Sequence, residues 1–136
     1  MTFAQADLFA LPLLNGGQGL GQIVEVEGDS VVVLITARPA ENAPVRAEDV
    51  LALFRVPSTQ FSSGAWPILG LQTLPPRRAT TPYPDDLIDP AFVEAFVNAC
   101  HGHILWDDFG GEDTFTNMLR PGVAPPPSAR FKWIRR

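Results

Sequence analysis

The hydrophobic and polar positions follow two different patterns, which divide the chain into a β-rich half, about residues 1–75, and a helical half, about residues 87–136. Short apolar runs between glycine- and proline-containing turns fill the first half, a pattern typical of strands. A connector at about residues 74–86 contains four prolines, which favour extended backbone. Because neither half is an obvious independent unit, we expect a single domain over residues 1–136.

The first apolar runs predict strands joined by tight turns. Residues 7–14 are expected to form an edge strand, because Pro12 has no N–H to donate to a ladder. The stretch "NGGQGLG", residues 15–21, lacks the GxGxxG spacing, and a strand-like run follows it instead of a helix. It therefore predicts a turn or bulge rather than a phosphate-binding loop. Gly28 and Asp29 lie between two β-rich runs, which indicates a two-residue hairpin.

The remaining runs of this half extend the sheet. In "QIVEVE" the alternation places Val24 and Val26 on one face and the glutamates on the other. The continuous apolar run at residues 30–37 predicts a central strand covered on both faces. Further strands are expected at residues 50–56 and 66–71. Together these runs predict a twisted, mostly antiparallel sheet of five or six strands.

Helical signals begin after the connector. Asp89 offers an N-cap acceptor and Pro90 suits the first helical position, so we expect a main helix over about residues 89–101, ended by Gly102. Its apolar face holds Phe92, Val93, Phe96, Val97 and Cys100, and its polar face holds Glu94, Asn98 and His101. A short second helix is expected at about residues 112–119, and the tail from residue 130 is a candidate terminal strand. The predicted fold class is α+β.

Composition and charge narrow the function. The chain carries a net charge of −5 with a pI of about 4.8, which argues against binding nucleic acid through its phosphates. The basic residues near the end, Arg130, Lys132, Arg135 and Arg136, are expected to pair with the protein's own acids or to be solvated. One cysteine, no signal-peptide pattern and no long apolar run predict a cytoplasmic protein that does not enter a membrane.

The stretch "CHGHILWDDFGGED", residues 100–113, is the most chemically suggestive part of the chain. Cys100 falls on the apolar helix face, so we expect a buried small side chain rather than a nucleophile. His101 falls in the last helical turn, where an imidazolium would interact favourably with the helix dipole. A metal-dependent hydrolytic site built from His101, His103 and Asp107 is the alternative, although zinc-type or calcium-type ligand spacing is absent. We expect no cofactor.

The aromatic residues of this stretch allow two interpretations. Ile104, Leu105, Trp106 and Phe109 could anchor the loop onto the sheet, or they could form an exposed patch with an acidic rim. Trp66 and Trp133 are expected in core or edge packing, with Trp133 close enough to the end to be exposed. A third interpretation of the whole chain is a small-ligand module that uses the glycine-rich turn and a pocket on the sheet.

The first half also resembles a known family. The order "ADLFALPLLNGGQGLGQIVEV", an apolar strand, "LFRV", and then "SGAWPILGLQTLP" is similar to the immunity protein 26 family of bacterial polymorphic toxin systems. The resemblance covers about residues 6–75, with Ala6 and Ala65 departing from the family pattern. The matching positions are Asp7, Phe9, Pro12, Leu13, Gly19, Gly21, Val24, Gly64, Trp66 and Gly70.

This resemblance implies a small cytosolic protein that binds and neutralises a cognate toxin domain without catalysis of its own. We place the partner-binding surface on the acidic stretch, because acidic rims speed encounter with basic partners. The candidate binding residues are Trp106, Asp107, Asp108, Glu112 and Asp113. An exposed apolar surface would serve a homodimer as well.

Overall fold

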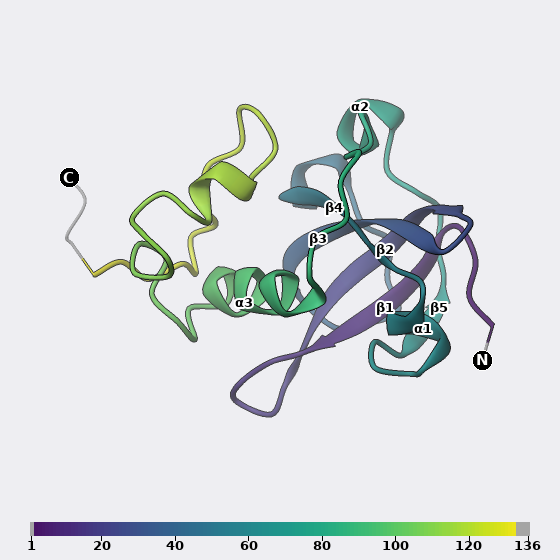
Figure 1. The fold of residues 1–136 in the computed structure, drawn as a ribbon, viewed down its shortest axis with the longest axis horizontal. Helices are drawn as coiled ribbons and strands as arrows, with labels where there is room; N and C mark the ends of the chain where they lie inside the picture. The colour runs from purple at the N-terminus through teal and green to yellow at the C-terminus, as the bar shows by residue number, and fades with distance from the viewer. Residues whose placement is uncertain (1, 133–136) are drawn as a thin grey trace.

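The computed structural model describes residues 2–132 and shows an α+β fold, as the sequence predicts. One antiparallel sheet has the strand order β4-β3-β2-β1-β5 (Figure 1). Its strands are β1 (Asp7–Pro12), β2 (Gln18–Glu27), β3 (Ser30–Pro39), β4 (Ala52–Pro57) and β5 (Ile68–Leu71). The helices are α1 (Thr59–Ser62), α2 (Arg77–Thr80) and α3 (Pro90–Cys100), with 3-10 turns η1 (Ala47–Asp49) and η2 (Thr116–Met118).

Two tight turns join the first three strands, as predicted. The β2–β3 hairpin uses only Gly28 and Asp29, and Gly28 adopts the left-handed φ of 61° that such a turn requires. The glycine-rich stretch supplies the β1–β2 turn, in which the Leu13 N–H donates to the Gly17 carbonyl at 2.9 Å. Core side chains already occupy the space beside the glycines that follow this turn. A Cβ on Gly21, for example, would lie 2.5 Å from the ring of Phe9. This stretch therefore leaves room for core side chains rather than for a ligand.

The predicted edge position of β1 is wrong, because β5 pairs with its outer side. Asp7 to Phe9 pair with β5, whereas Pro12 pairs only with Gln18 of β2. The short β5 ends its pairing before Pro12, so the missing N–H of the proline breaks no ladder on that side. The prediction failed because a proline excludes hydrogen bonding at one residue and not along a whole strand.

A bulge in β2 overturns the predicted alternation of Val24 and Val26. The pairing of β2 with β3 shifts in register between Ile23 and Glu25. Val24 joins the smaller apolar cluster on one face of the sheet, and Val26 packs against the larger cluster on the other. One extra residue in a strand reverses the faces of everything beyond it, which strict alternation cannot anticipate.

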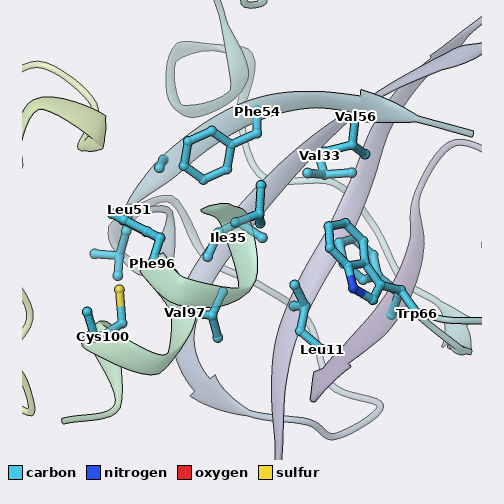
Figure 2. Packing of buried hydrophobic residues seen from close by; sticks show 14 of the residues in the cluster. Leu11, Val33, Ile35, Leu51, Phe54, Val56, Trp66, Phe96, Val97 and Cys100 are labelled. Atoms are coloured by element: carbon cyan, nitrogen blue, oxygen red, sulfur yellow. The ribbon is translucent and has the colours of Figure 1, made fainter. Parts of the chain in front are cut away.

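Apolar side chains cover both faces of the sheet. On the larger side, α3 packs over β1, β3 and β4, and Figure 2 shows Phe96, Val97 and Cys100 beside Ile35, Leu51 and Phe54. The smaller cluster lies on the opposite face, where Val32 and Leu34 pack with Val45 and Ala79. The predicted burial of β3 on both faces is therefore confirmed. Trp66 is fully buried and stacks on Phe9 with ring centroids 5.5 Å apart, so its predicted packing is confirmed.

Helix α3 begins and ends as the sequence predicts. The Asp89 carboxylate accepts a hydrogen bond from the Ala91 N–H at 2.9 Å, and Pro90 occupies the first helical position. Gly102 follows the C-cap with a φ of 78°. Asn98, on the predicted polar face, is buried. Its side chain accepts from the Leu14 N–H at 2.8 Å, tying the helix to the β1–β2 turn.

The segment after α3, residues 101–132, contains no second helix of the predicted length. Only the 3-10 turn η2 forms within residues 112–119, and Gly110 and Gly111 precede this stretch with φ values of 67° and 132°. Arg130 makes one isolated parallel bridge with Leu105 instead of the expected strand. Residues 133–136 of that expected strand, with the expectations for Trp133, Arg135 and Arg136, lie outside the described residues.

The connector contains the short helix α2, which the sequence pattern did not predict, and Thr81 directly after it has extended backbone. In Figure 1 the segment after α3, in light green to yellow, lies at the opposite end of the molecule from α1 and β5.

Among residues 2–132, no helix combines the length and apolar character that crossing a membrane would require.

Candidate functional site

Trp106 anchors the acidic stretch and does not line a surface. Its side chain is fully buried, and its ring centroid lies 5.7 Å from that of Phe96 and 5.6 Å from that of Phe115. The indole N–H donates to the Thr116 hydroxyl at 2.9 Å, so the polar end of the ring is satisfied. The anchoring interpretation is confirmed for Trp106, and its placement at the centre of an exposed surface is wrong.

Asp107 is also buried, with 2% of its area exposed. Its Oδ1 accepts a hydrogen bond from the backbone N–H of Lys132 at 2.6 Å. This contact ties the end of the described chain to the loop, so the carboxylate has a structural role. Its predicted place on an accessible binding surface is wrong, because the side chain is buried and bonded to the backbone of Lys132.

The other three predicted acids, Asp108, Glu112 and Asp113, are exposed. Asp108 lies 3.4 Å from the ammonium of Lys132, which confirms the predicted pairing of that lysine with an acid of the chain. Both partners of this pair are solvated, so it contributes only about 0–1 kcal/mol. Within residues 2–132, Glu112 and Asp113 form no salt bridge, so their charges are available to a partner.

Phe92 belongs to this surface although the sequence pattern assigned it to the buried helix face. Its side chain is 47% exposed, and its ring meets that of Phe109 edge-on with centroids 6.1 Å apart. The signal for its exposure is its position in the first turn of α3, where Ala91 is exposed as well. We define the aromatic–acidic face as Phe92, Phe109, Asp108, Glu112 and Asp113.

A continuous series of aromatic rings connects this face to the core. Phe109 stacks on the buried Phe115 with centroids 5.0 Å apart and an interplanar angle of 15°. Phe115 in turn contacts Phe96, which meets Phe54 of β4 edge-on at 5.4 Å. The rings of Phe92 and Phe109 are therefore positioned by the core before any partner arrives, which reduces the ordering cost of binding.

The cysteine and the first histidine lack the properties of a catalytic pair. Cys100 is fully buried, as predicted, and this burial raises the pKa of its thiol well above the usual range, so no reactive thiolate forms at neutral pH. Burial, and then the nearby His103, lower the pKa of His101. The fold therefore disfavours the imidazolium that would interact with the helix dipole at this position.

The alternative metal ligands do not converge. The rings of His101 and His103 stack with centroids 6.2 Å apart, while the Asp107 carboxylate points inward to the Lys132 backbone. Across residues 2–132, no group of three or more histidine, cysteine or acidic side chains is placed to hold a metal ion. The Asp107 carboxylate is instead bonded to the end of the described chain, which ligand spacing alone could not reveal.

No protein-family model, curated protein or solved structure matches this chain. The resemblance of residues 6–75 to the immunity protein 26 family therefore stays a prediction. The assignment of function depends on the geometry of the surface.

Proposed function

We propose that this protein acts by binding and neutralising a toxin domain, as an immunity protein does, and that the aromatic–acidic face receives a basic surface of that partner. The observation that carries the proposal is the exposed Phe92 in edge-on contact with the partly buried Phe109, together with three exposed carboxylates within four residues of Phe109 in the chain. Aromatic anchors with a polar rim are the arrangement in which few residues supply most of the binding energy.

The charges of the face favour a basic partner over a second copy of this chain. A two-fold homodimer through this face would bring Asp108, Glu112 and Asp113 against the same carboxylates of its partner, which is repulsive. The net charge of −5 adds a long-range attraction to any basic protein. The resemblance to immunity proteins also favours binding to a toxin partner. No observation among residues 2–132 favours the metal-dependent hydrolase.

Capture from the organism's own lysate, with quantitative mass spectrometry, tests the proposal. The tagged protein is compared with Glu112→Gln/Asp113→Asn and with Asp29→Asn/Glu48→Gln, which changes the net charge equally through exposed acids outside the face. We expect a stoichiometric basic partner on the wild type and the control variant, and its loss from the first variant. The captured domain should be toxic when expressed alone and harmless when this protein is co-expressed.

Equal capture by all three proteins would contradict the assignment of the face. A captured partner whose expression is harmless would contradict the immunity function, even if the face binds it.

A further inference from the structure

A pocket of about 410 Å³ lies between β4, the connector and the chain after η2, and it shares no residue with the aromatic–acidic face. Its walls combine two arginines with a largely apolar surface. The lining residues are Leu53, Arg78, Thr81, Pro82, Tyr83, Pro84, Met118, Leu119, Arg120 and Pro121. A volume of this size is within the range of small-molecule sites.

The two arginines are the unusual feature of this pocket. The chain has 15 acidic residues and only 10 lysines and arginines, yet neither Arg78 nor Arg120 forms a salt bridge within residues 2–132. Both also line an adjoining hollow of about 350 Å³. The acid in that hollow, Glu48, lies 3.4 Å from the guanidinium of Arg46, a different arginine.

Arg120 is held in place by the chain beneath it. Its backbone N–H donates to the Leu51 carbonyl at 2.8 Å, and its side-chain Nε–H donates to the Val50 carbonyl at 3.0 Å. These bonds use one side-chain donor and orient the guanidinium. Its terminal nitrogens make no hydrogen bond to residues 2–132, so they are available to an oxyanion.

The rest of the wall suits an apolar group. Leu53 and Leu119 are half-buried in the pocket, and Tyr83 packs against the smaller core cluster with its ring in the wall. A guanidinium pairs with carboxylate or phosphate through two parallel hydrogen bonds, while the apolar wall gains by excluding water. A ligand that satisfies both the guanidinium and the apolar wall has an anionic head group and an apolar body.

We propose that this pocket binds a small organic oxyanion, a carboxylate or a phosphate monoester, whose head group meets Arg78 and Arg120 and whose apolar body lies along Leu53, Leu119 and Tyr83. The site is independent of the proposed immunity function, because a toxin partner is assigned to a different surface.

Titration of the isotope-labelled full-length protein by two-dimensional NMR tests the site. The probes are benzoate, phenyl phosphate, benzyl alcohol and inorganic phosphate. We expect benzoate or phenyl phosphate to shift signals of pocket residues with a dissociation constant near 1 mM or tighter, and the neutral alcohol and the bare ion to bind at least about tenfold more weakly. The tighter of the two aromatic probes identifies the head group.

Adjacent arginines provide the matched variants. Arg78→Gln should weaken the preferred probe about tenfold, whereas Arg77→Gln, which removes the same charge from an exposed residue outside the pocket, should leave its affinity unchanged. Both residues are exposed, so both variants should fold. No saturable shift with either aromatic anion, equal weakening by the two variants, or inorganic phosphate binding as tightly as phenyl phosphate would overturn the proposal.

Discussion

The sheet and the segment after α3 are ordered by different means. The sheet repeats one interaction, the backbone ladder, along five strands whose two faces are both covered. The segment at residues 101–132 has a single 3-10 turn and is held by individual anchors such as Trp106 and Asp107. The difference teaches that irregular chain can present a defined surface when a few side chains fix it to the core.

Backbone hydrogen bonds over long sequence distances complete the anchoring. The Trp106 N–H donates to the Arg130 carbonyl at 2.7 Å, and the Arg120 N–H donates to the Leu51 carbonyl at 2.8 Å. The first bond joins two parts of the segment, and the second joins the segment to the residue before β4. Neither belongs to a repeating ladder. Losing one anchor should therefore release much of the segment, whereas losing one contact in the sheet should leave its ladder formed.

Trp106→Ala is expected to have the largest effect. Removing a fully buried tryptophan leaves a cavity between Phe96 and Phe115 and should lower the free energy of unfolding by about 3–5 kcal/mol. In hydrogen exchange measured by mass spectrometry, peptides from residues 101–132 should lose protection while those of β2 and β3 keep it. If all peptides lose protection equally, the segment and the sheet are one cooperative unit and the comparison fails.

Gly21→Ala tests the sheet itself. The new Cβ would lie 2.5 Å from the Phe9 ring and 2.9 Å from the Leu34 carbonyl oxygen, and backbone cannot yield easily. We expect a loss of about 3 kcal/mol in chemical denaturation, with uniform loss of protection. Gly17→Ala is the control, because the new methyl would meet only the exposed side chain of Asn15. Equal losses for both variants would show that the tight packing of Gly21 has no energetic consequence.

Asp107→Ala should cost about 2 kcal/mol, because it leaves the Lys132 N–H without its buried acceptor. The neighbouring Asp108→Ala removes an exposed ion pair and should change stability by less than about 1 kcal/mol. Thermal unfolding of the two variants side by side measures the difference. A smaller loss for Asp107 than for Asp108 would contradict the structural role of the buried carboxylate.

His101 should produce the smallest effect, visible as a dependence of stability on pH. Because burial lowers its pKa in the folded protein, the unfolded chain binds the proton more readily. Its contribution is fully present above the unfolded pKa of about 6.5, and stability is lost as the pH falls from there through the folded value. His101→Gln should flatten the dependence in this window. An unchanged profile would mean that His101 titrates normally.

The sequence predicts the repeating parts of the structure well and the anchored parts poorly. The hairpin at Gly28-Asp29 and the cap of α3 depend on residues close together in the chain, so local chemistry suffices to find them. The roles of Trp106 and Asp107 depend on Thr116 and Lys132, which only the fold brings near. Of the candidate site, the three exposed acids were predicted correctly as surface charges. Phe92 was missed because helical periodicity shows which residues share a face but not which of them the fold leaves uncovered.

The affinity of the captured toxin domain for Phe92→Ala tests the central claim most directly. Phe92 is exposed in the aromatic–acidic face, and Leu71, at 69% exposure on β5, supplies a matched apolar control outside it. By calorimetric titration, the account predicts that Phe92→Ala raises the dissociation constant at least about tenfold and that Leu71→Ala leaves it unchanged. Wild-type affinity in Phe92→Ala, or an equal loss in both variants, would contradict the claim that this face binds the partner.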